Sequence, residues 1–177
     1  MEKFPVATLN RGDFFRESER ACERAAQAHT LSAVVLDVDH LDAINHEFGR
    51  SVGDFVVGLV AKNALYCSKI VGRLGGEEFV LLLEDHALPD AFKIAEALRR
   101  KIADRAVRIG DKLIKFTCSF GVEEWEFGET IDELLRRADI ALFRAKAAGG
   151  NRTVGYNTAQ SSLDDSRTII PLRLGDR

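Results

Sequence analysis

Two patterns of hydrophobic and polar positions alternate along this chain. Short, nearly continuous apolar runs are typical of buried strands, whereas charged segments with apolar residues three or four positions apart are typical of amphipathic helices. The apolar runs predict strands at 32–36, 70–74, 79–83, 105–109 and 112–122. The helical spacing predicts helices at 10–29, 41–47, 55–69, 87–103 and 131–147.

The order of these elements predicts an α/β fold. With tight turns at Gly75-Gly76 and Gly110-Asp111, it favours an α+β sandwich, in which helices pack on one mainly antiparallel sheet. A chain of 177 residues is within the size of a single domain and can bury a sizeable core. We assign residues 1–157 to the domain and residues 158–177, which are polar before a short apolar stretch, to a flexible C-terminal tail.

Composition and charge narrow the class of protein. Hydrophobic residues make up 46% of the chain and charged residues 30%, as in an ordinary globular protein. The net charge of −3 gives no electrostatic argument for binding nucleic acid or an anionic membrane. No apolar stretch is long enough to span a bilayer and no signal-peptide core is present, so we expect a cytoplasmic protein without membrane contact from this segment. Cys22, Cys67 and Cys118 lie far apart in apolar settings, which favours reduced core thiols.

The segment from Arg73 to Phe79 carries the first candidate chemistry. Gly75-Gly76 predicts a tight turn, and Glu77-Glu78 follow it at the start of an apolar run. Glycines let the backbone turn sharply and let another group come close to it. Two carboxylates on such a turn can bind a hard cation such as Mg²⁺ or accept a proton. The alternative is a hairpin tip with solvated charges.

A second acidic pair, Asp37 and Asp39, comes at the end of the predicted strand 32–36. If the strand continues that far, alternation puts both carboxylates on the same face. Acids at the end of a buried strand are a recurring way to hold a metal beside the phosphates of a nucleotide. The alternative is that the strand has ended and the acids face water, and a second acidic cluster in the same small domain makes that alternative weaker.

These motifs belong to a longer ordered series. Over residues 8–155 the chain resembles the GGDEF family, the diguanylate cyclases. The family signature appears as Gly75-Gly76-Glu77-Glu78-Phe79. The other matching segments are Thr8-Leu9-Asn10-Arg11, Leu36-Asp37-Val38-Asp39-His40-Leu41, Ile44-Asn45, Gly49, Gly53-Asp54, Thr117-Cys118-Ser119-Phe120-Gly121-Val122, Ala138-Asp139-Ile140-Ala141-Leu142-Phe143, Ala145-Lys146 and Asn151-Arg152.

The resemblance implies a fold and a reaction. The fold is that of nucleotidyl cyclases, similar to a polymerase palm, in which the acids of the first strand and of the Gly-Gly hairpin meet at one edge of the sheet. The reaction joins two GTP molecules into cyclic di-GMP and releases pyrophosphate. Because each subunit of the family holds one GTP, the implied active form is a homodimer.

The resemblance also implies a role for each matching position. It makes Asp37, the Val38 carbonyl and Glu77 ligands of Mg²⁺, with two ions per site and Mn²⁺ as the alternative metal. Glu77 would help to deprotonate the attacking 3′-hydroxyl and Glu78 would support the metal site, so these two are the candidate catalytic residues. The candidate substrate-binding residues are Asn45 and Asp54 for guanine, Gly75 and Gly76 for close approach of the nucleotide, and Arg50 and Lys146 for phosphate.

Two of these residues have structural alternatives. Lys146 near the end of a helix is also explained as a solvated cation that the helix dipole favours. Asn45 is also explained as a helix cap. The sequence does not separate these roles from binding roles.

Several positions depart from the family pattern. Asp42 replaces a lysine that contacts the triphosphate, so an anion stands where the ligand is strongly anionic. His46 replaces an aspartate, and Arg50 replaces a histidine and partly restores a cation. Gly150 replaces an arginine, and Arg152 lies two residues further on. Two lost cations and one added anion should weaken GTP binding and the electrostatic stabilisation of the transition state.

The inhibitory site of the family is also altered. Tyr66 and Lys69 stand where many members carry the arginine and aspartate that bind product, so we expect no product feedback through that site. The sensory module usually found before the domain is not in this sequence. We expect it upstream of this chain, or regulation by partner chains in its place.

Two hypotheses follow from these matches and departures. The first is a working diguanylate cyclase with weakened substrate contacts, which the intact Asp37, Glu77 and Glu78 favour. The second is a catalytically inactive GGDEF domain that binds GTP or a protein partner and serves as a regulatory module, which Asp42 and Gly150 favour. On the motifs alone, the first has the advantage.

Overall fold

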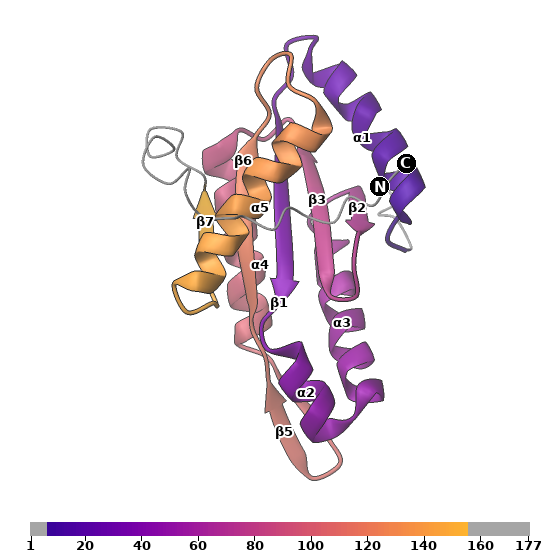
Figure 1. Ribbon diagram of the computed structural model, residues 1–177, viewed down its shortest axis with the longest axis vertical. Coiled ribbons are helices and arrows are strands. Elements are labelled where there is room, and N and C mark those ends of the chain that lie inside the picture. The colour runs from indigo at the N-terminus through magenta and orange to yellow at the C-terminus, as the bar shows by residue number, and fades with distance from the viewer. Residues whose placement is uncertain (1–6, 156–177) are drawn as a thin grey trace.

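A five-stranded sheet lies at the centre of the fold, with the strand order β2-β3-β1-β6-β7 (Figure 1). The computed structural model describes residues 7–155, so the tail predicted at 158–177 lies outside the described residues. β1 runs antiparallel to β3 and β6, β2 runs antiparallel to β3, and β7 runs parallel to β6, so the predicted mainly antiparallel sheet is confirmed. The strands are β1 (Leu31–Val38), β2 (Ile70–Arg73), β3 (Glu78–Glu84), β6 (Cys118–Glu124) and β7 (Thr153–Gly155).

Helices cover both faces of this sheet (Figure 1). α3 (Arg50–Ala64) and α4 (Leu88–Ala103) pack on one face, and α1 (Arg11–Ala25) and α5 (Ile131–Ala147) pack on the other. Because successive side chains of a strand point to opposite faces, β1 contributes to both cores. Val34, Leu36 and Val38 join the core with α3 and α4, whereas Leu31, Ala33 and Val35 join the core with α1 and α5. The predicted sandwich is therefore confirmed.

The segment predicted as one strand at 112–122 forms two strands in different sheets. β5 (Lys112–Lys115) pairs with β4 (Ala106–Ile109) in a separate hairpin, whereas β6 begins at Cys118 and pairs with β1. Between them Phe116 is buried, and the Thr117 carbonyl accepts a hydrogen bond of 2.9 Å from the Asp39 amide. The prediction was wrong because the apolar pattern runs on through the bend, while contacts with a distant segment impose the change of sheet.

Other boundaries also differ from the predictions. α1 ends at Ala25, and beyond it Ala28 has a left-handed φ of 80°. The helix predicted at 55–69 is α3 at 50–64. It ends before Ser68, because the Ser68 hydroxyl accepts from the Ile70 amide (3.0 Å) and donates to the Leu82 carbonyl (2.5 Å), which ties this segment to the sheet. The short helix expected at 41–47 is α2 (Leu41–Phe48). β7 was not predicted, since three residues give no periodic signal.

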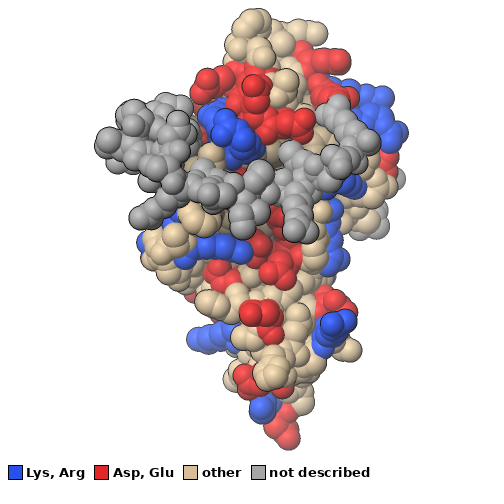
Figure 2. Space-filling view, in the orientation of Figure 1, with Lys and Arg blue, Asp and Glu red and all other residues tan. Residues whose placement is uncertain are grey.

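Three further features of the described residues concern the surface, the helices and the cysteines. On the face seen in Figure 2, acidic and basic side chains of the described residues are interspersed, and no continuous basic stripe is visible there. None of the helices within residues 7–155 combines the length and the apolar character needed to cross a membrane. All three cysteines are free, and burial raises the pKa of each thiol, to about 11 for Cys22.

α5 lies directly on β6. A Cβ built on Gly121 would lie 2.0 Å from the carbonyl oxygen of Ala138 and 2.4 Å from the amide nitrogen of Leu142. Backbone therefore meets backbone at this point, and β6 needs a glycine here for close approach rather than for an unusual conformation. This contact fixes the distance between α5 and the sheet along its middle turns.

Arg137 fastens the beginning of α5 to the end of β6. Its guanidinium donates to the buried Glu123 carboxylate (2.7 Å), to the Glu124 carbonyl (2.6 Å) and to both carboxylate oxygens of Glu129 (2.8 Å each). A buried carboxylate needs such a partner, because an uncompensated charge in the interior is strongly destabilising. Side-chain bonds and the Gly121 contact thus hold α5 in one position on the sheet.

The Gly121 contact gives a stability prediction. Gly121→Ala should lower the free energy of unfolding by about 3 kcal/mol, because the added methyl group can be accommodated only by moving α5 away from the sheet. Gly58→Ala is the matched control, since a Cβ at Gly58 would meet nothing within 4 Å on α3. Alanine in a helix interior should raise stability there by about 0.5–1 kcal/mol. Urea denaturation of both variants checks this, and equal effects would contradict the role of Gly121.

Candidate active site

Acidic side chains from two strands meet at one end of the sheet. Asp37 is the penultimate residue of β1, and Glu78, the first residue of β3, lies directly opposite it in the register of the two strands. Because directly opposed residues of antiparallel strands point to the same face, their carboxylates are neighbours. Glu77 precedes Glu78 in the turn that connects β2 to β3. The predicted convergence of the two acidic segments is therefore present in the fold.

Lys146 is the cation of this cluster. It lies in the last turn of α5, and its Nζ is 2.9 Å from Oδ1 of Asp37. The Asp37 side chain is 15% exposed, whereas that of Lys146 is 41% exposed. Although the ion pair is close, Asp37 Oδ1 is fully buried and receives no hydrogen bond of ordinary geometry from the described residues. The structure thus joins Lys146 to Asp37 at the end of α5, where the helix dipole also favours a cation.

The three carboxylates disfavour each other's charge. Burial raises the pKa of Asp37, and Asp39 adds to this while Lys146 opposes it. Burial and the Asp37 charge likewise raise the pKa of Glu77, with Asp42 as a further acidic neighbour. Burial raises the pKa of Glu78 to about 7, together with the charges of Asp139 and Asp37. One ammonium group does not compensate this much negative charge, so the cluster favours an additional cation or a proton.

Two members of this electrostatic group were not predicted as site residues. Asp139 raises the pKa of Glu78, and Arg11 at the start of α1 lowers it. Asp139 lies seven residues before Lys146, which puts both on the same side of α5 after two turns. That spacing is a signal by which the sequence could have identified Asp139. Arg11 belongs to the matching segment Thr8-Leu9-Asn10-Arg11, but its spacing carries no such signal, and the packing of α1 on the sheet brings it near Glu78.

The turn before β3 leaves room for the Glu78 side chain and for a ligand to approach its backbone. The Arg73 guanidinium donates to the carbonyl oxygens of Gly75 (3.3 Å) and Gly76, and the Glu78 carbonyl accepts from the Leu74 amide (3.2 Å). Neither glycine has a positive φ, so the turn does not need them for an unusual conformation. A Cβ at Gly75 would lie 3.3 Å from the Glu78 carboxylate, whereas one at Gly76 would meet nothing within 4 Å. Gly75 therefore makes room for Glu78, and the backbone at Gly76 is open to a ligand.

The predicted guanine and phosphate contacts of the middle segment lie on the hairpin of α2 and α3. Asn45 belongs to α2, and its Oδ1 lies so close to Gly53 that a Cβ there would be 1.9 Å from it. Asn45 is not a cap, because α2 is preceded by His40 and α3 by Gly49 as cap residues. Arg50 and Asp54 occupy exposed positions in the first turns of α3. Asp42 lies in the first turn of α2, on the side of the hairpin nearer the carboxylates.

Asp39 has a different environment from Asp37. β1 has ended at Val38, yet the Asp39 carboxylate is buried and accepts hydrogen bonds from Thr117, Ser119 and the Asn151 amide. Asp37 pairs with Lys146 and Asp39 with Asn151, so both face the C-terminal end of α5, as the predicted alternation requires. Beside them is a hollow of about 220 Å³, which is lined by Asp39, His40, Lys146, Gly149 and Gly150.

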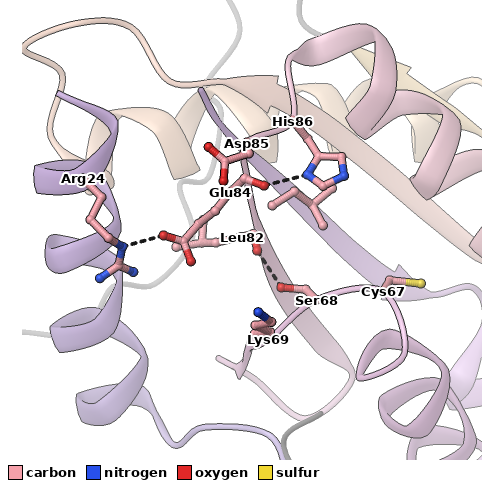
Figure 3. A pocket seen from close by; sticks show the side chains of 9 residues that line it. Arg24, Cys67, Ser68, Lys69, Leu82, Glu84, Asp85 and His86 are labelled. Atoms are coloured by element: carbon pink, nitrogen blue, oxygen red, sulfur yellow. Dashed lines mark hydrogen bonds and ion pairs between the residues drawn. The ribbon is translucent and has the colours of Figure 1, made fainter. Parts of the chain in front are cut away.

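A larger hollow, of about 450 Å³, lies at the other end of β3 (Figure 3). Three of the charged side chains that line it are paired: Arg24 Nε is 2.6 Å from Glu84, and Asp85 is 2.7 Å from His29, which lies outside the lining. Of the two altered positions of the family's inhibitory site, Lys69 lines this hollow. The ring centroid of the other, Tyr66, lies 5.4 Å from the ammonium nitrogen of Lys101. The carboxylates of the larger hollow, Glu84 and Asp85, are already paired with Arg24 and His29. The smaller hollow contains Lys146, which is paired with Asp37 of the acidic cluster, so it is the better candidate active site. The remaining lining residues are Cys67, Ser68, Leu82, Leu83 and His86.

Comparison with known proteins agrees with this arrangement. The family model of the GGDEF domain of diguanylate cyclases matches residues 7–152. The chain belongs to the GGDEF family. It is 39% identical over 150 residues to diguanylate cyclase DgcM of Escherichia coli K12, covering 82% of this chain and 36% of DgcM. It is 36% identical over 131 residues to the response regulator PleD of Caulobacter vibrioides, covering 71% of this chain and 29% of PleD.

Solved GGDEF domains share the fold. The GGDEF domain of DgcB from Caulobacter crescentus, in complex with c-di-GMP, superposes with a TM-score of 0.80 at 28% identity, covering 88% of this chain and 99% of that one. The active GGEEF domain of a diguanylate cyclase from Vibrio cholerae gives a TM-score of 0.78 at 31% identity, covering 84% and 97%. The palm-like cyclase fold is therefore confirmed. This GGDEF domain spans about a third of the length of the curated relatives DgcM and PleD.

The buried carboxylates of this GGDEF domain give a pH-dependent prediction. Because the pKa of Glu78 is about 7 in the folded protein and near 4.5 when unfolded, folding takes up a proton between these values and stability falls as the pH rises through this range. Glu78→Gln should therefore stabilise the domain at pH 8, by about 1 kcal/mol after solvent screening is allowed for. The gain should vanish below pH 4.5, where the glutamate is protonated in both states.

Thermal denaturation in the presence of a chelator, from pH 4.5 to pH 8, measures this gain. Glu23→Gln is the control, because Glu23 is exposed on the outer side of α1. A stabilisation by Glu78→Gln that did not change with pH would contradict the assignment of the effect to the charge of this carboxylate.

Proposed function

We propose that this GGDEF domain is a diguanylate cyclase, which condenses two molecules of GTP into cyclic di-GMP and releases pyrophosphate. The observation that carries the proposal is the gathering of Asp37, Glu77 and Glu78, with raised pKa values, beside Lys146 at one end of the sheet. Keeping such carboxylates close and desolvated costs stability, and sites with perturbed pKa values of this kind are typical of catalysis. The identity to proteins named diguanylate cyclases supports the same reaction.

The residues of this chain have roles that their positions allow. Glu77, whose raised pKa makes it a better base than an ordinary carboxylate, would accept the proton of the attacking 3′-hydroxyl. Lys146 would exchange Asp37 for the phosphate oxygens of the substrate. Asn45 and Asp54 offer the amide and carboxylate that pair with the edge of guanine, and Arg50 offers a cation at the start of α3. The open backbone at Gly76 would let the nucleotide come close to the turn.

The donor set fits a divalent metal. Asp37 presents a buried carboxylate oxygen that pairs with the Lys146 ammonium at 2.9 Å, and Glu77 is an adjacent carboxylate, so hard oxygen ligands and excess negative charge coincide. Within residues 7–155, no three His, Cys, Asp or Glu side chains form a ready metal site by themselves, so the set relies on Asp37, Glu77 and the Val38 carbonyl together with substrate oxygens. When bound there, a pair of Mg²⁺ ions, or Mn²⁺ in their place, would neutralise the triphosphate and the charge that develops at the attacked phosphate.

The proposed active form is a homodimer in the cytoplasm. Each subunit would hold one GTP, and the two would have to face each other for the two 3′-hydroxyls to reach the two α-phosphates. A sensory module outside this chain would control how often the subunits meet. Neither nucleic acid nor membrane contact is part of this proposal, because the net charge is only −3.

One observation favours the second function, a catalytically inactive domain that binds GTP or a protein partner. Asp42 lies close enough to Glu77 to raise the pKa of that carboxyl. The presence of an anion in place of the family's lysine therefore affects the carboxylates of the site directly. The lost cation at Gly150 adds to this effect. A weakly binding domain of this kind would regulate partners through its nucleotide-dependent shape rather than through turnover.

Replacement of Glu77 tests the reaction. Glu77→Ala should lower the formation of cyclic di-GMP by about 1,000-fold or more, because it removes both a base and a metal ligand. Its melting temperature should not fall, since Glu77 lies in a partly exposed turn. Incubation of concentrated protein with GTP and Mg²⁺, followed by chromatography of the products, measures this. Equal product from Glu77→Ala and from the unsubstituted chain would exclude the proposed role, and no product from either would favour the inactive domain.

Replacement of Asp42 tests the electrostatic handicap. Asp42→Lys should strengthen GTP binding by about five- to tenfold, because a screened repulsion becomes an attraction. Glu47→Lys makes the same change of charge in the last turn of the same helix and should have little effect. Titration with a fluorescent GTP analogue compares the two variants. Equal gains would show that overall charge, and not the position of Asp42, limits binding.

A further inference from the structure

The Asp39 carboxylate is saturated by hydrogen bonds from elsewhere in the chain. Oδ2 accepts from the Thr117 hydroxyl (2.6 Å) and the Asn151 amide (2.9 Å), and Oδ1 accepts from the Ser119 hydroxyl (2.6 Å). Asp39 is only 8% exposed. Its donors come from the start of β6 and from the loop between α5 and β7, 78 to 112 residues away in sequence. Asp39 therefore connects three separate segments at the end of the sheet.

The loop that Asp39 holds has an unusual backbone. Gly149, Gly150 and Asn151 have successive φ values of 108°, 71° and 48°. Glycine adopts a positive φ without a steric cost and asparagine tolerates it better than most residues, so the sequence Gly-Gly-Asn permits this run. A Cβ at Gly150 would lie 3.1 Å from the Asp39 carboxylate, so the loop is pressed directly against this side chain. On the other side, Arg99 Nη1 of α4 donates to Oδ1 of Asn151 at 2.5 Å.

The held loop shapes the candidate active site. Gly149 and Gly150 line the hollow of about 220 Å³ together with Lys146, which is three residues before Gly149. If the loop moved away, this wall of the hollow would be lost and the end of α5 would be free to shift. Asp37, by contrast, keeps a buried oxygen without a hydrogen bond, so the two aspartates of this segment are chemically distinct.

We propose that Asp39 is a positioning residue that clamps the loop 149–151 against the end of the sheet and so forms the wall of the hollow that receives the phosphates of the nucleotide. The inference rests on the proposed function for the identity of the ligand, but the clamp itself does not. Asp39 also lines this hollow, but its carboxylate oxygens are occupied by Thr117, Ser119 and Asn151, so its role is to hold the loop rather than to bind the nucleotide. Its carboxylate geometry, and not its charge, is what the site requires.

Two substitutions separate geometry from charge. Asp39→Ala removes all three acceptor contacts. Asp39→Asn keeps one oxygen, which can accept from the Asn151 amide and the Thr117 hydroxyl. Its side-chain NH₂ group can donate to the Ser119 hydroxyl, because a hydroxyl both donates and accepts hydrogen bonds. Thr117→Val removes a single donor and provides a milder variant if Asp39→Ala folds poorly. Asp90→Ala is the control, because Asp90 is an exposed acid that pairs only locally with Lys93.

Amide hydrogen exchange tests the clamp without any nucleotide. In Asp39→Ala, exchange at Asn151 should accelerate by about 10- to 100-fold, as expected for loss of a hydrogen bond to a charged group. In Thr117→Val the acceleration should be smaller, and in Asp39→Asn and Asp90→Ala exchange should stay within about threefold of the unsubstituted chain. Unchanged exchange at Asn151 in Asp39→Ala would overturn the clamp, whatever the activity of the domain.

Binding of a non-hydrolysable GTP analogue in the presence of Mg²⁺ tests the effect on the site. Asp39→Ala should raise the dissociation constant by about tenfold, and Asp39→Asn should restore it to within about threefold. If Asp39→Asn bound as weakly as Asp39→Ala while its exchange was normal, the charge of Asp39 would be the requirement and the positioning role would be overturned. If the unsubstituted chain bound no analogue, the proposed function and the phosphate wall would fail together, and exchange would still decide the clamp.

Discussion

The arrangement of this domain depends on the direct contact between α5 and β6 at Gly121. Because no side chain separates the two backbones, α5 lies closer to the sheet than helix packing normally allows, and its last turn reaches the end of β1. In this arrangement the last turn of α5 lies with Lys146 2.9 Å from Asp37, and the loop that follows reaches Asp39. α5 also contributes Leu134, Leu135, Ala138 and Leu142 to one of the two cores, so its contact with β6 supports both that core and the acidic end of the sheet.

The acidic end of the sheet lowers the stability of the fold locally. Asp37, Glu77 and Glu78 are held where burial and the charges of nearby carboxylates raise all three pKa values, and Lys146 compensates only part of that charge. The two hydrophobic cores on either side of the sheet provide the stability that offsets this cost. The residual negative charge at this end of the sheet favours a further cation, and Asp42 adds to that charge.

Two neighbouring aspartates, one in β1 and one just beyond its end, have different partners. Asp37 pairs with the Lys146 ammonium, and its buried oxygen has no hydrogen bond of ordinary geometry from the described residues. Asp39, two residues further on, accepts hydrogen bonds from Thr117, Ser119 and Asn151 and so belongs to the framework of the site. The alternation of the strand put both on the same face, but it could not distinguish them, since the difference lies entirely in the partners that distant segments bring.

The sequence by itself determined the family, the sandwich of helices on a mainly antiparallel sheet, the acidic turn after Gly75-Gly76, and α5 at 131–147, because these rest on local periodicity and on residue types at fixed spacing. It did not determine the break between β5 and β6, the end of α3 at Ala64 or the strand β7, where contacts from residues far away in the chain decide against the local pattern. It also did not show Asp139 and Arg11 beside Glu78 or the hold of Asp39 on the loop after α5. Only tertiary structure decided these, because hydrogen bonds and charge interactions depend on distance in space, which the order of residues does not specify.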